Sequence, residues 1–246
     1  MLYLIGLGLK GDLTLEGFQI AQTCQLYLES YTTFLTVSVK DLEKTLQKKI
    51  TLLRREEVEE TQEFLKGSHK RDVALLVGGD PLIATTHTEI LIEAKTRGIK
   101  TRIIHNSSIY SAIAETGLQI YKFGRTVTIP FPQKGFRPTS FYDIIQQNRE
   151  NGAHTLVLLD IQEETNRYMN PKEALDILQS LGFREPLLCV SRLGAPDQHI
   201  IYGAIDDLLA LREEFWGLPP HCVVVPGLLH FKEEEFLQKF WTRVIL

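Results

Sequence analysis

Residues 72–87 constrain the fold most, because they join an unbroken apolar run to a pair of glycines and then to a helix start. The run Val73–Val77 predicts a buried strand. Gly78-Gly79 ends it with a turn in which other atoms can approach the backbone closely. Thr85 and Thr86 are candidate N-caps of the next helix. Ligands of open α/β sheets bind at such carboxyl-end loops, so this turn is the first candidate site.

Asp80 places one carboxylate at the tip of this turn. A phosphate cradle uses backbone N–H groups and a lysine, as in GxxxxGK[ST], and the chain lacks that motif. A carboxylate would repel a phosphate at close range, whereas it suits a cationic group or sugar hydroxyls. The alternative is that Asp80 only caps the turn, since Gly-Asp-Pro is ordinary turn chemistry. The residues alone leave both interpretations open.

Strands and helices alternate through the first half of the chain, which predicts βαβ units and a mainly parallel sheet. We expect strands at Leu2–Ile5, Leu26–Leu28, Ile50–Leu53, Val73–Val77 and Thr101–His105, a helix capped by Thr14 or Asp12, and helices over 39–49 and 56–66. Prolines interrupt this rhythm after residue 122, so we expect an α/β domain over residues 1–121 and a second one over 122–246.

The second half also mixes helices with strands. Asn170-Pro-Lys-Glu173 predicts a capped helix start. Leu187–Val190 and His199–Tyr202 flank a Gly/Pro/Asp turn, which predicts an antiparallel pair and therefore a mixed sheet.

Composition excludes several classes of protein. The 246 residues carry a formal net charge of −4, which argues against a dedicated nucleic-acid binder. Cys24, Cys189 and Cys222 lie far apart in apolar segments, so we interpret them as reduced core residues, and the chain has no CxxC or HExxH metal motif. No apolar run approaches the ~20 residues that span a bilayer, and the first residues do not resemble a signal peptide. We therefore expect no membrane association, no metal and a cytoplasmic location.

The first glycine loop permits a different interpretation. Gly6-x-Gly8-x-x-Gly11 follows a strand, and Glu29 lies near the spacing at which an acidic residue binds a ribose hydroxyl in dinucleotide-binding folds. A nucleotide-type ligand is a fair inference, but the six-residue pattern is weak by itself. A plain glycine turn that packs a helix on the sheet is the alternative.

Two glycine loops in this order, Gly6-x-Gly8 and Gly78-Gly79-Asp80-Pro81, resemble those of the class III (tetrapyrrole-methylase-like) S-adenosylmethionine methyltransferases. Longer collinear blocks resemble the diphthine synthase branch of this family. These are Leu4-Ile-Gly-Leu-Gly-Leu9, Gly79-Asp-Pro-Leu-Ile-Ala-Thr-Thr-His87, His105-Asn-Ser-Ser-Ile-Tyr-Ser-Ala112, Thr116-Gly-Leu-Gln-Ile-Tyr-Lys-Phe-Gly124, Pro138-Thr-Ser-Phe-Tyr-Asp143, His154-Thr-Leu-Val-Leu-Leu-Asp160 and Val225-Pro-Gly-Leu-Leu-His230.

The resemblance implies a two-domain class III methyltransferase fold with S-adenosyl-L-methionine in the interdomain cleft, and a homodimer. It also implies N-methylation of the amino group of a modified histidine on translation elongation factor 2. Matching to the family's cofactor-contacting positions carries over eight residues, with no catalytic residue assigned: Leu9, Asp80, Ile83, Ser108, Ile109, Leu159, Leu193 and His230.

Three other functions remain as alternatives. A methyltransferase acting on a small molecule such as a tetrapyrrole would share the fold, and a non-catalytic cofactor-binding module could keep it. A dehydrogenase that uses the first glycine loop is the third. Without the resemblance, His230, His87 and His105 would be interpreted as ordinary histidines bonded to backbone.

Overall fold

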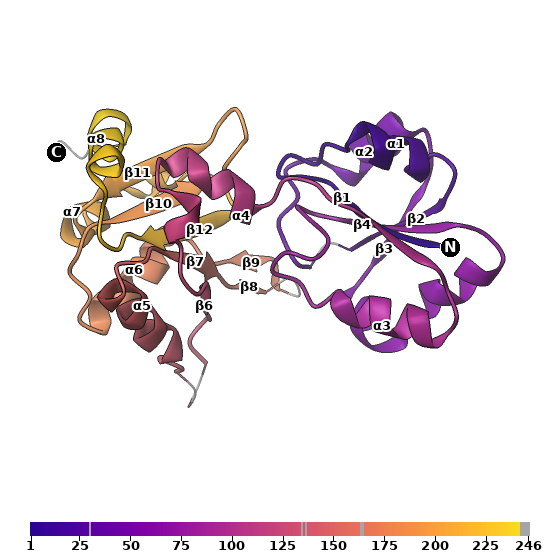
Figure 1. Ribbon diagram of the computed structural model, residues 1–246, viewed down its shortest axis with the longest axis horizontal. Coiled ribbons are helices and arrows are strands. Elements are labelled where there is room, and N and C mark those ends of the chain that lie inside the picture. Colours follow the sequence, from indigo (N-terminus) through magenta and orange to yellow (C-terminus); the bar gives the residue numbers. More distant parts are fainter. Residues whose placement is uncertain (30, 134, 136, 163–164, 242–246) are drawn as a thin grey trace. The chain divides into compact units, whose positions relative to one another are not determined.

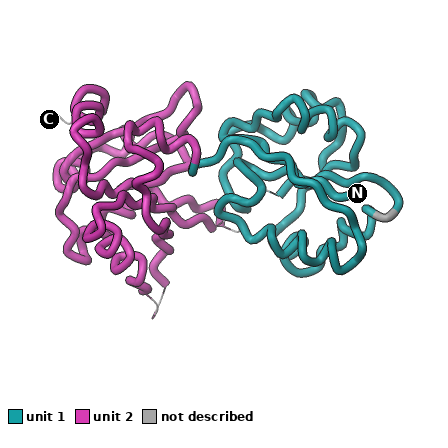
Figure 2. The backbone as a smooth tube through the Cα atoms, in the orientation of Figure 1, with its two compact units in different colours: residues 1–110 teal, residues 111–246 magenta. Residues whose placement is uncertain are grey.

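The computed structural model describes residues 1–29, 31–133, 135, 137–162 and 165–241. The chain divides into two compact units, residues 1–110 and 111–246 (Figure 2). The sequence placed this boundary after Tyr121. The intervening residues bond to the second unit: the Trp241 Nε1–H donates to the Thr116 carbonyl at 3.1 Å, and the Gln119 N–H donates to Glu233 at 2.7 Å.

Unit 1 is a parallel five-stranded sheet with the strand order β3-β2-β4-β1-β5. Helices α1 and α2 cover one face and α3 the other (Figure 1). Each face has its own apolar core, and the side chains of β4 are buried throughout. The elements are β1 (Leu2–Gly6), α1 (Leu15–Ala21), β2 (Gln25–Glu29), α2 (Val39–Leu46), β3 (Ile50–Leu53), β4 (Val73–Val77), α3 (Thr88–Thr96) and β5 (Thr101–Ile104), with α4 (Ile109–Ala112) crossing into unit 2.

The predicted strands of unit 1 are confirmed, and β3 and β4 have the expected bounds. Thr14 caps α1 as predicted, since its Oγ1 accepts the Gly17 N–H at 3.0 Å. Two expectations were wrong. Residues 56–66 do not form one helix: Gln62 is left-handed and separates a π-helical turn, Glu57–Thr61, from a 3-10 segment, Glu63–His69.

The second wrong expectation concerns the start of α3. Its N-cap is His87, and neither threonine caps it, because both hydroxyls donate elsewhere. The Thr85 hydroxyl donates to the Pro81 carbonyl at 2.8 Å, and the Thr86 hydroxyl donates to Glu59 at 2.9 Å.

Unit 2 contains a mixed five-stranded sheet with the order β11-β10-β12-β7-β6, in which only the β6–β7 pair is parallel. The predicted antiparallel pair is β10–β11, and the predicted capping box at Asn170 is present at the start of α6. Side chains of α5, α6 and α7 form one core with the sheet. The elements are β6 (Val127–Ile129), α5 (Ser140–Glu150), β7 (Thr155–Leu159), β8 (Ile161–Gln162), β9 (Arg167–Tyr168), α6 (Pro171–Ser180), β10 (Leu187–Ser191), β11 (His199–Gly203), α7 (Ile205–Leu209), β12 (His221–Val225) and α8 (Phe231–Phe240).

Among the described residues, no helix has both the length and the apolar character needed to span a membrane.

Candidate functional site

The two glycine loops of unit 1 are bonded to each other at the carboxyl ends of neighbouring strands. The Gly8 N–H donates to the Gly79 carbonyl at 3.1 Å, and the Gly79 N–H donates to the Gly8 carbonyl at 3.0 Å. Both residues have left-handed φ angles, of 62° and 70°, which glycine adopts without strain. A Cβ on Gly6 would lie 2.6 Å from the Gly79 oxygen, whereas one on Gly79 would find its nearest atom at 3.9 Å. The loops are therefore closely packed on one side, and the space beside Gly79 is open.

Asp80 is buried and its carboxylate is bonded within unit 1. One oxygen accepts the Leu82 N–H at 3.0 Å. The other accepts the Asn106 N–H at 3.2 Å and lies 2.7 Å from the His105 Nδ1. Asp80 therefore caps its own turn and also ties it to the loop after β5. This is the turn-capping role that the sequence left open, extended to a second loop.

Asn106 is a residue that sequence reasoning did not single out. Its side-chain amide donates to the carbonyls of Gly6, at 3.0 Å, and Asp12, at 2.7 Å. The next residue continues this link, because the Ser107 Oγ accepts the Leu9 N–H at 3.3 Å. The position of Asn106, directly after a strand and within the quoted block 105–112, is the signal that could have found it.

The structure distributes the eight predicted site residues over both units. Leu9, Asp80 and Ser108 lie in the loops at the carboxyl edge of the unit 1 sheet, and the Ile83 N–H donates to the Asp80 carbonyl at 3.2 Å. Ser108 is buried, while Leu9, Ile83 and Ile109 are half-buried. Leu159, Leu193 and His230 belong to unit 2, where the two leucines are buried and His230 is exposed.

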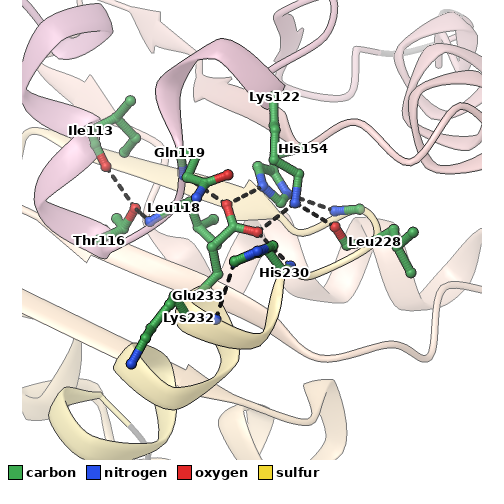
Figure 3. Close-up of polar contacts among 11 residues, drawn as sticks. Ile113, Thr116, Leu118, Gln119, Lys122, His154, Leu228, His230, Lys232 and Glu233 are labelled. Carbon is green, nitrogen blue, oxygen red and sulfur yellow. Dashed lines mark hydrogen bonds and ion pairs between the residues drawn. The ribbon is translucent and has the colours of Figure 1, made fainter.

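His230 is the N-cap of α8 (Figure 3). Its Nδ1 accepts the Lys232 N–H at 3.3 Å, and its own N–H donates to the Glu233 carboxylate at 2.8 Å. This is a reciprocal capping box. With Nδ1 acting as an acceptor, the ring carries its proton on Nε2.

Glu233 is buried beneath this cap and accepts four hydrogen bonds (Figure 3). Besides His230, the donors are the Gln119 N–H at 2.7 Å, the Lys122 ammonium at 2.5 Å and the His154 Nε2–H at 3.0 Å. Burial alone would raise the pKa of Glu233, but these hydrogen bonds outweigh it and hold the pKa at about 2. Glu233 is therefore a permanent anion paired with Lys122.

His154 is the neutral member of this network. It is fully buried, and burial lowers its pKa below the ordinary value. Its Nδ1 accepts the Gly227 N–H at 2.9 Å, so the Nε2 carries the proton that is donated to Glu233. Sequence reasoning missed the network because its members come from three separate segments, residues 119–122, His154 and residues 227–233.

Glu29 caps a turn and does not have the ribose-binding role that the dinucleotide interpretation assigned to it. Its buried carboxylate accepts the N–H groups of Tyr31, at 3.2 Å, and Thr32, at 3.1 Å, so it caps the turn after β2. In addition, β4 lies between β1 and β2. The first glycine loop is therefore bonded to the second one, and the Glu29 carboxylate accepts hydrogen bonds from the backbone of its own turn.

Similar proteins identify the family of this chain. The family model described as Tetrapyrrole (Corrin/Porphyrin) Methylases matches residues 1–209. The chain belongs to this family. Diphthine synthases from Methanococcus aeolicus and Methanococcus maripaludis are 42% and 41% identical to it, covering 97% and 99% of this chain and 97% and 100% of theirs. The chain is thus a methyltransferase of the diphthine synthase branch of the tetrapyrrole methylases.

Solved structures agree with this family assignment. A protein from Entamoeba histolytica has a TM-score of 0.89 and 36% identity, with 99% of both chains covered. A diphthine synthase has a TM-score of 0.89 and 30% identity, with 98% of this chain and 95% of that chain covered. The fold expected from the sequence, a parallel sheet followed by a mixed sheet in the tetrapyrrole methylase arrangement, is confirmed.

Proposed function

We propose that this tetrapyrrole methylase family member binds S-adenosyl-L-methionine at the bonded glycine loops of unit 1. The open space beside Gly79 supports this, because a ligand can reach bare backbone there and a side chain would fill that space. The proposed contacts are the eight residues carried over from the family resemblance: Leu9, Asp80, Ile83, Ser108, Ile109, Leu159, Leu193 and His230. When bound, the cofactor supplies an electrophilic methyl group on a sulfonium.

We further propose that the acceptor is the amino group of a modified histidine on translation elongation factor 2. The diphthine synthase name of relatives about 40% identical over nearly the full chain supports this substrate over a tetrapyrrole. Transfer to a neutral amine needs placement of the two reactants in a dry site more than it needs a strong base. The protein's part is to hold the reactants with glycine loops and apolar side chains.

Two further proposals concern the location of the reaction and the assembly of the protein. A translation factor is made and used in the cytoplasm, so we place the reaction there. We propose a homodimer from the family resemblance. Sedimentation at micromolar concentration should show a species of twice 28.1 kDa, and a species of 28.1 kDa alone would contradict it.

Calorimetric titration tests the cofactor. S-adenosylhomocysteine, the product form of the cofactor, should bind one site per chain, and NAD should give no measurable heat. The reason is that Glu29, which a dinucleotide site would need for the ribose, is bonded to its own turn. Tight NAD binding without S-adenosylhomocysteine binding would overturn the proposal.

Asp80→Asn is expected to weaken both the fold and the cofactor site. An amide cannot accept all the hydrogen bonds that reach this carboxylate, because its NH2 must face one of the donors. A charge-assisted hydrogen bond contributes about 1.5–3 kcal/mol, so the unfolding free energy should fall by that amount. The affinity for S-adenosylhomocysteine should fall about tenfold to a hundredfold.

His105→Ala is the matched control, since it removes one donor and leaves the Asp80 charge in place. It should change the affinity much less. If wild type and Asp80→Asn bind S-adenosylhomocysteine with dissociation constants within about twofold of each other, Asp80 only caps its turn. The polar contacts to the cofactor would then come from backbone groups and Ser108.

A further inference from the structure

The loop that carries His230 is anchored at three points by one hydrogen-bond network centred on the buried side chains of Glu233 and His154. The Gly227 N–H bonds to His154, the Leu228 carbonyl accepts from the Lys122 ammonium at 2.6 Å, and the His230 N–H bonds to Glu233 (Figure 3). Glu233 also binds Lys122 and His154 directly. The Glu233 carboxylate therefore bonds to the His230 N–H directly. It also holds the Lys122 and His154 side chains, which bond to the other two points of the loop.

A capping box does not require this arrangement. At the start of α6, Glu173 performs the same capping role for Asn170 with a side chain that is 35% exposed, whereas the Glu233 side chain is 1% exposed. Burying the Glu233 carboxylate beside the half-buried Lys122 ammonium costs desolvation, and apolar residues in place of such a pair are often as stable or more so. The burial of Glu233 and its three further donors, Gln119, Lys122 and His154, thus exceed what helix capping needs. Fixing a loop in one geometry is the role that remains.

The ring of His230 is the group that this loop presents. Its Nδ1 is occupied by the Lys232 N–H. Its Nε2–H bonds to none of the described residues, and the residue is exposed. A proton donor with a defined direction is therefore available to a ligand, and its direction depends on where Glu233 holds the backbone.

We propose that Glu233 is a positioning residue: it holds the 226–230 loop so that the Nε2–H of His230, one of the proposed cofactor contacts, keeps one direction. The inference rests on the proposed function and deepens it, because it separates a residue that contacts the cofactor from one that acts only through that contact.

A double-mutant cycle on S-adenosylhomocysteine affinity tests the inference, using His230→Ala, Glu233→Gln and the two combined. Loss of one hydrogen bond predicts about threefold to tenfold weaker binding for His230→Ala. Glu233→Gln should weaken binding about as much, and the combination should be within about twofold of the weaker single variant. A residue that only stabilises the fold would lower the melting temperature without this coupling.

Lys122→Met/Glu233→Gln serves in place of Glu233→Gln if the single variant does not fold, because it removes both charges of the ion pair together. Independent effects that multiply, unchanged affinity in the Glu233 variant, or unchanged affinity in His230→Ala would each overturn the inference while the proposed function stands. A wild-type protein that does not bind S-adenosylhomocysteine would overturn the proposed function, and this inference with it.

Discussion

Gly79→Val should abolish S-adenosylhomocysteine binding while the protein still folds. A Cβ at this position has its nearest protein atom, the Ser107 oxygen, at 3.9 Å, so the branch point of the valine side chain lies in open space. That open space is where we propose the cofactor approaches the backbone. Because φ is 70°, the substitution should also lower the unfolding free energy by about 1–2 kcal/mol. Calorimetry and thermal unfolding measure the two effects separately.

Gly98→Val is the matched control for this experiment. Gly98 also has a φ of 70°, and a Cβ there would have no atom within 4 Å. It follows α3 at the opposite end of the sheet from the glycine loops, just before β5. Both variants should lose similar stability, and only Gly79→Val should lose binding. Normal affinity in folded Gly79→Val would show that this loop is not the site.

Glu233→Gln should destabilise the protein by about 3–5 kcal/mol at pH 7, because it leaves the Lys122 ammonium without its buried partner. Glu235→Gln is the control, from the same helix. The pKa of Glu235 is also lowered to about 2, through its hydrogen bonds with Lys232 and Lys239, but its side chain is 41% exposed. Solvent screens such a surface pair, so Glu235→Gln should leave the unfolding free energy nearly unchanged.

The two variants should also differ in their pH dependence. The folded pKa of Glu233 is depressed from 4.5 to about 2, so its stabilisation is complete above pH 4.5 and is lost as the pH falls towards 2. The difference in unfolding free energy between wild type and Glu233→Gln should therefore shrink over that range. Denaturant titrations at pH 7, 5, 4 and 3 measure it. A difference that stays constant with pH would contradict the charge pairing described for Glu233.

Local sequence patterns were enough to predict the strand and the turn that carry the site. The strand Val73–Val77 could be predicted because an unbroken apolar run fits only a buried position, and the Gly78-Gly79 turn because glycine tolerates its backbone angles. The Asn170 capping box was equally local, since all of its groups lie within four residues. Thr85 and Thr86 show the limit of such patterns. Each is a good capping residue, but carbonyl and carboxylate partners elsewhere bind their hydroxyls.

The polar contacts of the site could not be predicted, because they join residues that are distant in sequence. Asn106 bonds to the Gly6 carbonyl 100 positions away, and Glu233 bonds to Gln119 across 114. No periodicity encodes such pairs, and they become visible only once the sheet order is known. The same holds for Glu29, whose spacing fitted a ribose contact while its carboxylate binds its own turn.

Methyl transfer to elongation factor 2 tests the proposed function most directly. The acceptor should be elongation factor 2 purified from cells that lack this enzyme, incubated with the protein and S-adenosylmethionine that carries a labelled methyl group. The proposal predicts label on the modified histidine, at its amino nitrogen, with wild type and none with Gly79→Val. Absence of label on elongation factor 2 from a wild-type protein that binds S-adenosylhomocysteine would contradict it.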